Sequence, residues 1–132
     1  MTTKIPLVLL ANTSNAVSPA VTRERLDLTI TTPPVEGGMV LGSIVNGATG
    51  PNAQVVVKIM VAPKQASMPA AGPEGVGAND WRTVATFVGG IVAAAITPIL
   101  WRFGPEVAYL QIEMSGNTGQ PVSASAVVHA YG

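Results

Sequence analysis

The sequence contains no cysteine, a single histidine and few charged residues. The missing cysteines exclude disulfides, thiolate metal sites and thiol nucleophiles. One histidine, His129, excludes a metal cage built from several imidazoles. Charged residues make up only 11% of the 132 residues, and seven basic residues balance seven acidic ones. Because phosphate binding needs clustered Lys and Arg, we expect no nucleic-acid partner.

The residues of a catalytic site are also scarce. A glycosidase needs two facing carboxylates, and the strand pattern places Asp27 and Glu113 on the outward faces of separate strands. We interpret both as solvated strand residues, and no nucleophile accompanies His129. The segment Gly72–Gly77 lacks the Lys-Ser/Thr pair of a phosphate loop. A hydrolase is therefore the weakest hypothesis, and we expect no enzyme activity, cofactor or metal site.

Two apolar stretches are candidates for export or membrane insertion. Ile5–Ala11 is seven residues long and is interrupted by Pro6, so we interpret it as a first strand rather than a signal peptide. Thr83–Trp101 has the length of a membrane span, but a Gly-Gly pair and Pro98 would break a helix there. We expect no membrane partner.

Hydrophobic residues make up 48% of the chain, the net charge is zero and the mean hydropathy is +0.42. A free soluble domain of this size usually carries net charge, which opposes self-association. We therefore expect a surface covered by partners and a closed homo-oligomer. The alternative is an uncharged secreted or structural domain.

Alternation of apolar and polar residues between Gly- and Pro-rich turns predicts short strands. The predicted strands are Ile5–Ala11, Arg25–Thr31, Gly38–Asn46, Gln54–Ala62, Asp80–Val88, Glu106–Met114 and Val122–Ala130. The segment 91–100 fits a strand pair or a short helix, and its proline favours extended structure. We expect two hairpins, through residues 46–53 and 115–121. The pattern predicts an all-β fold, an antiparallel β-sandwich or jelly roll.

The predicted domain organisation has three parts. Residues 1–21 form an extended N-terminal arm that adds a strand to a neighbour. Residues 22–132 form a single β-sandwich domain with a long loop at residues 63–79. That loop is rich in Pro, Gly and Ala and has no periodicity, and loops of this length are usually functional or mobile. We expect it to contact a partner; an inert surface loop is the alternative.

The chain has only six aromatic residues, including Trp81 and Trp101. A β domain with so few aromatics needs them in its core or in an interface, which we prefer to stacking on a sugar. The run Arg23-Glu24-Arg25 is interpreted as a solvated strand start, with an ion pair to a neighbouring subunit as the alternative.

Several segments of the C-terminal half resemble small virion proteins of tailed bacteriophages. These segments are DWRTVATF (80–87), WRF (101–103), VAYLQI (107–112), SGNTG (115–119) and residues 122–131. The resemblance implies a capsid decoration (cement) protein, or another head or tail accessory protein. Its location would be the virion, after assembly in the host cytoplasm, and its partners the major capsid protein and sibling subunits. No functional residues carry over.

A cement protein binds across joints of the shell and stabilises only the assembled state. The residues expected to contact partners come from the long loop and the Arg23 run. These candidates are Gln65, Met68, Pro69, Glu74, Arg23 and Arg25. The competing hypothesis is a carbohydrate- or receptor-binding module of a phage tail or fibre, which exposed tryptophans in a concave surface would favour. Buried tryptophans and an apolar outer patch would favour the shell protein.

Overall fold

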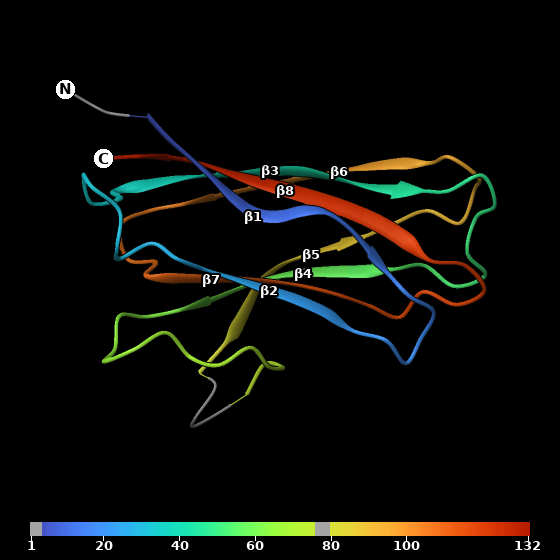
Figure 1. Ribbon diagram of the computed structural model, residues 1–132, viewed down its shortest axis with the longest axis horizontal. Coiled ribbons are helices and arrows are strands. Elements are labelled where there is room, and N and C mark those ends of the chain that lie inside the picture. The colour runs from blue at the N-terminus through green and yellow to red at the C-terminus, as the bar shows by residue number, and fades with distance from the viewer. Residues whose placement is uncertain (1–3, 76–79) are drawn as a thin grey trace.

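The structure is a computed structural model that describes residues 4–75 and 80–132. None of these residues is helical, so the described chain contains no helix that could cross a membrane. Two four-stranded antiparallel sheets pack face to face (Figure 1), which confirms the predicted all-β sandwich. The strands are β1 (Lys4–Asn15), β2 (Thr22–Asp27), β3 (Gly37–Asn46), β4 (Val56–Ala62), β5 (Arg82–Val88), β6 (Ile96–Phe103), β7 (Tyr109–Ser115) and β8 (Val122–Tyr131).

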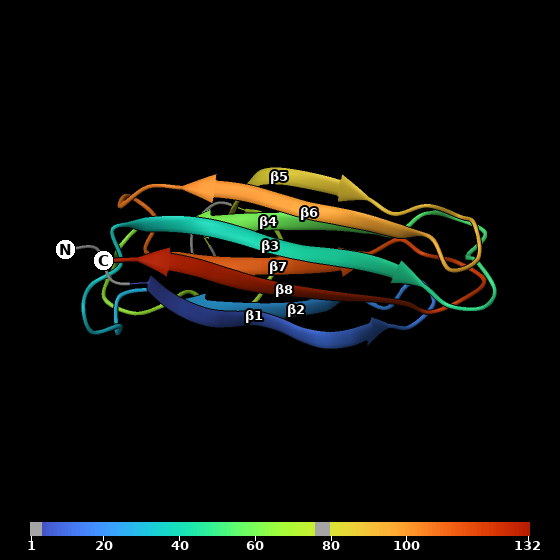
Figure 2. The ribbon, with the colours of Figure 1, turned by 90° about the horizontal axis from the view of Figure 1, so that it is seen from above.

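The strand order is that of a jelly roll. Sheet A has the order β1-β8-β3-β6 and sheet B the order β2-β7-β4-β5. Each strand pairs with its counterpart counted from the other end of the chain: β1 with β8, β2 with β7, β3 with β6, and β4 with β5. The chain is therefore one long antiparallel hairpin rolled into two layers (Figure 2), with the β4–β5 loop at its tip.

The core lies between the sheets and is built from the inward positions of the strands. In β8 every second residue from Val122 to Ala130 is buried, as predicted, and β3 contributes the buried Val40 and Ile44. Sheet B contributes Ile59 and Ile112, among others. Burying each such side chain stabilises the fold by about 1.5–3 kcal/mol before the entropy of ordering is subtracted.

Both predicted hairpins are wrong. The turn after Asn46 leads from sheet A into sheet B, and residues 116–121 lead from sheet B back into sheet A. Buried amides hold these crossings: the Asn117 Nδ2 donates to the Gln120 carbonyl at 2.9 Å, and the Asn46 Nδ2 to the Val92 carbonyl at 2.8 Å. Alternation reports which face of a strand is buried, but it does not identify the strand beside it.

The N-terminal segment differs from the expected arm. Lys4–Asn15 forms β1, an edge strand of the protein's own sheet A, with Lys4 opposite Tyr131. Pro6 is tolerated because an edge strand leaves one side of its backbone unpaired. Residues 16–21 of the expected arm form the connection from β1 to β2, and residues 1–3 lie outside the described residues.

Several strand boundaries also differ; for example, the strand expected at Glu106–Met114 begins at Tyr109. The strand expected at Arg25–Thr31 ends at Asp27, whose carboxylate accepts a 2.8 Å hydrogen bond from the Thr29 N–H and starts a turn. Ile30 is consequently 77% exposed. The ambiguous segment 91–100 becomes strand only from Ile96, because Ala94 has a left-handed φ of 58° in the preceding turn.

Gly42 lies in the middle of β3, between β6 and β8, and leaves no room for a side chain. A Cβ there would meet the Ser125 carbonyl oxygen and lie 2.9 Å from the Ala126 Cα. We expect Gly42→Ala to lower the free energy of unfolding by about 1–3 kcal/mol, as overpacking does. Gly47→Ala, with no atom within 4 Å of the added Cβ, is the matched control. Urea denaturation of both variants checks this, and equal midpoints would contradict it.

Candidate functional site

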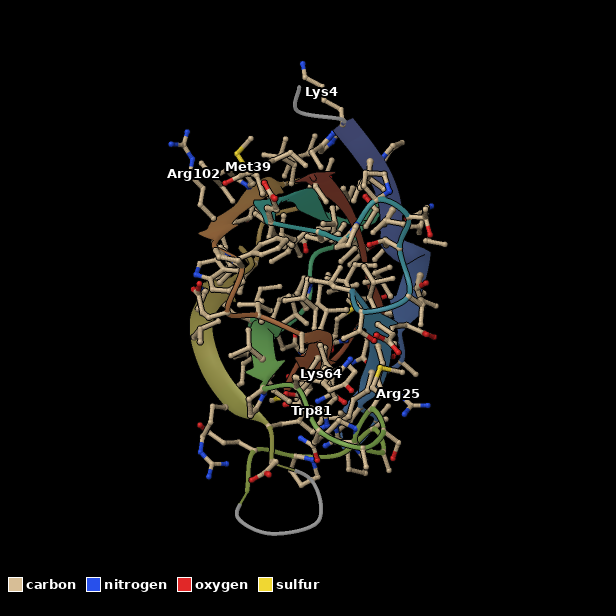
Figure 3. All side chains as sticks on the ribbon, turned by 90° about the vertical axis from the view of Figure 1, so that its left-hand side faces the viewer. Lys4, Arg25, Met39, Lys64, Trp81 and Arg102 are labelled. Carbon is tan, nitrogen blue, oxygen red and sulfur yellow. The ribbon has the colours of Figure 1, made fainter. Side chains whose placement is uncertain are left out.

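The two outer faces of the sandwich differ in what covers them. The outer side of sheet B, here called the covered face, lies beneath the described part of the β4–β5 loop (Figure 1). The outer side of sheet A, here called the bare face, has none of the described residues 4–75 and 80–132 folded over it (Figure 1). Figure 3 separates the two: Lys4, Met39 and Arg102 lie on the side of the bare face, and Arg25 and Trp81 lie on the opposite side.

A second, smaller apolar cluster fills the space between the loop and the covered face. It contains Met60, Ala62, Trp81, Ala108 and Tyr109, with Met68 of the loop packed against it. Trp81 is fully buried, and its Nε1 donates a 2.8 Å hydrogen bond to the Ala70 carbonyl. Strand β7 is consequently buried on both faces from Tyr109 to Met114.

Hydrogen bonds hold the loop in place on its own sheet. The fully buried Gln111 side chain donates to the Gly72 carbonyl at 2.8 Å and accepts from the Gly72 N–H at 3.1 Å. The Tyr109 hydroxyl donates to the Gln65 carbonyl at 3.1 Å, and the Arg25 Nη1 to the Pro69 carbonyl at 2.8 Å. These bonds satisfy loop backbone groups that would otherwise be buried without partners. Residues 76–79 of the predicted loop lie outside the described residues.

The candidate contact residues of the loop lie at different depths. Gln65 and Met68 are half-buried, and Pro69 is buried. Glu74 is exposed, and its carboxylate accepts hydrogen bonds from the Thr83 N–H at 3.0 Å and the Thr83 hydroxyl at 3.3 Å. The loop therefore presents a pre-formed surface, because its polar groups already have partners within the chain.

Arg23 and Arg25 lie on β2, an edge strand of sheet B. Arg25 joins the loop through Pro69, whereas the Arg23 Nε is 2.8 Å from the Glu113 carboxylate, in an ion pair within the chain. The interpretation of Glu113 as solvated is wrong: the residue is 6% exposed. Glu113 lies between Arg23 of β2 and Lys58 of β4, and a buried carboxylate needs such a partner as Arg23.

The other residues singled out in the sequence do not form a reaction centre. Asp27 lies opposite Tyr109 in the β2–β7 register, and Glu113 lies opposite Arg23, so the two carboxylates occupy different rows of sheet B. Within residues 4–75 and 80–132, no group of three His, Asp or Glu residues is arranged to hold a metal ion. Trp101 is half-buried against the core and stacks on Phe103, with ring centroids 5.7 Å apart.

The bare face carries aliphatic side chains at its outward positions. Val8, Val127, Leu41 and Leu100 stand in register and form one row across all four strands. Val8 is 62% exposed and Leu100 51%, and Ile96, near one end of the same face, is 70% exposed. The sequence carries a signal for this face: the polar-side positions of these strands often hold Val, Leu or Ile instead of charged residues.

Charge is divided unequally between the sheets. The four strands of sheet A contain two charged residues, Lys4 and Arg102, and no acidic residue. The strands of sheet B contain seven charged residues. At the end of the bare face near the termini, a cleft of about 590 Å³ is lined by Lys4, Met39 and His129, among others. The bare face therefore has an aliphatic central row with serines between that row and one end, and positive charge at the other end only.

Comparison with known proteins shows the fold. No protein-family model matches the sequence, and no curated protein sequence matches it significantly. The crystal structure of the cleaved adhesin domain of Lys-gingipain from Porphyromonas gingivalis is similar, with a TM-score of 0.53, 12% identity, and coverage of 90% of this chain and 73% of that one. The VP2 subviral particle of infectious bursal disease virus is also similar, with a TM-score of 0.51, 11% identity and coverage of 98% of this chain. This chain spans about a third of the VP2 chain, 32%.

The Gln111 side chain gives a test of how the loop is held. Gln111→Ala leaves the buried N–H and carbonyl of Gly72 without partners, so we expect a loss of about 2–4 kcal/mol in the free energy of unfolding. We also expect faster proteolytic cleavage within residues 63–81 under native conditions. Gln54→Ala, at an exposed position, is the control. Unchanged cleavage in the loop of the Gln111 variant would show that other contacts hold it.

Proposed function

We propose that the protein is a structural component of a viral particle, a decoration (cement) protein that binds the assembled shell and its major capsid protein. One observation carries the proposal: the sandwich has one face covered by the described part of its own loop, and an opposite face that has an aliphatic central row and is nearly uncharged. Such a molecule can contact one partner through the loop-covered face of sheet B and another through the bare face of sheet A. The similarity of its fold to a capsid protein that forms subviral particles supports the same assignment.

The proposed mechanism needs no chemistry beyond binding. A protein that binds the assembled shell but not its free subunits shifts the equilibrium towards the shell by mass action. We assign the shell contact to the outer surface of the β4–β5 loop, with Gln65, Met68 and Glu74, and to the neighbouring Arg25. Because these loop residues are already held by hydrogen bonds within the chain, binding orders few additional groups and loses little conformational entropy.

A carbohydrate- or receptor-binding module is the second candidate. The similarity to an adhesin domain favours it. The burial of Trp81 beneath the loop speaks against a sugar stacked on that ring. Binding to shells, rather than to cell surfaces or glycans, distinguishes the two functions.

The proposal is tested on particles of the virus that encodes the chain, assembled without it. We expect the purified protein to co-sediment with these shells, to saturate at a fixed stoichiometry and to raise the temperature at which they fall apart. Free capsid subunits should not bind. Particles that neither take up the protein nor gain stability, together with binding to host-cell surface glycans, would support the second candidate instead.

Single substitutions test the loop contact better than a deletion of residues 65–77, which would also uncover Trp81. Ser67 is exposed on the loop, so Ser67→Arg should leave the fold intact and place a long charged side chain in the contact. We expect shell affinity to fall about tenfold or more, as it does when an interface position is disrupted. Ala48→Arg, in the exposed β3–β4 crossing, is the control. Equal binding of both variants would exclude the loop surface as the contact.

A further inference from the structure

We propose that the bare face of sheet A is the contact between two copies of this chain. The copies pack face to face so that each strand of sheet A runs antiparallel to the same strand of the other copy. This inference goes beyond binding to a shell. It concerns the protein alone, so it is tested without a shell, and its failure would leave the proposed function standing.

The size and composition of the bare face support a second copy as its occupant. Four strands about 4.8 Å apart and about ten residues long cover roughly 600 Å². Two such faces together bury roughly 1,200 Å², the lower limit for a stable interface. The central row of Val8, Leu41 and Leu100 would then lie in the middle of the contact, where interfaces are most apolar.

The position of the charges selects the orientation. Lys4 and Arg102 lie at the end of the face near the termini, and the outward positions of the opposite end hold Val45, Ile96 and Ser123. A two-fold axis along the strands would bring the cations of both copies together. A two-fold axis across the strands, within the plane of the face, places the cationic end of each copy over the uncharged end of the other. Like charges are then kept apart.

The shape of the face agrees with this orientation. The cleft of about 590 Å³ lies at the cationic end, and the 70% exposed Ile96 projects near the other end. In the antiparallel pair, β6 of each copy lies over β6 of the other, so Ile96 comes to the cationic end of that strand. A second cleft of about 330 Å³ lies there, lined by Arg102, Met39 and His129 among others, and it can receive Ile96 of the other copy.

The pair would have its two covered faces on opposite outer sides. Each copy would then direct its loop surface away from the other. If that surface binds the shell as proposed above, one pair can hold two shell subunits across a joint, and the two contacts reinforce each other through their linkage.

Sedimentation velocity of the full-length protein at micromolar concentrations tests the contact. We expect a species of twice 13.5 kDa. Leu41→Lys should raise the dimer dissociation constant about a hundredfold, because one lysine from each copy would enter the apolar contact. Val84→Lys is the matched control, since Val84 is as exposed as Leu41 (42% against 36%) but lies in sheet B. Circular dichroism and urea denaturation verify that both variants fold.

Three results would overturn the proposal. The first is a wild-type protein that is monomeric at all these concentrations. The second is a dimer that Val84→Lys dissociates and Leu41→Lys does not. The third is a monomer whose Leu41→Lys variant loses binding to shells, because the face would then belong to the shell contact.

Cysteine cross-linking tests the orientation without interference, because the chain has no cysteine of its own. Ile96→Cys and Arg102→Cys place single thiols near the two ends of the outward side of β6. The antiparallel pair predicts disulfide-linked dimers when the two variants are mixed, and none from Ile96→Cys alone. A two-fold axis along the strands would lay β6 of one copy over β1 of the other, and Ile96 over the end of β1 that holds Ser14. Disulfides between Ile96→Cys and Ser14→Cys, without links between Ile96→Cys and Arg102→Cys, would therefore overturn the proposed arrangement.

Discussion

The pairing of each strand with its counterpart from the other end of the chain is the constraint on which the structure depends. Once β4 and β5 pair, β3 must meet β6, β2 must meet β7 and β1 must meet β8. Rolling this long hairpin into two layers makes the connections other than the β4–β5 loop cross between the sheets. Both ends of the chain therefore lie at the same end of the sandwich, as Figure 1 shows.

The β4–β5 loop differs from the crossings because it leaves and re-enters the same sheet. It is free to fold back over the outside of sheet B, where Gln111 and Trp81 hold it. That cover makes a second interior, in which Trp81 and the Gln111 side chain are fully buried. The described residues of this loop lie over sheet B and not over sheet A, so the molecule has two unlike faces.

The sequence predicted local features well and non-local ones poorly. The sequence correctly predicted which side of Val122–Ala130 is buried and that residues 82–88 alternate between the two faces of their sheet. Both predictions rest on the pleat of a strand, which depends only on neighbouring residues. The partner of each strand depends on segments far away in the chain, and both expected hairpins failed for this reason. The burial of Glu113 could not be predicted either, because it depends on which strands lie beside β7: Arg23 of β2 and Lys58 of β4 are opposite it. The bare face was readable as Val and Leu at outward positions, once the sheet had been assigned.

The nested pairing also sets an order of events as the chain folds. Pairing Val61 with Arg82 closes a short loop of chain, so β4 and β5 meet at a small loss of chain entropy. Pairing Lys4 with Tyr131 closes a loop that contains almost the whole chain, so its entropy loss is larger. Pairs near the tip are thus favoured early and the terminal pair late, in the slow manner of folds with distant contacts. The apolar row from Val8 to Leu100 needs β1 and β8 in place. As a continuous row across four strands, it therefore exists only on chains that have finished folding.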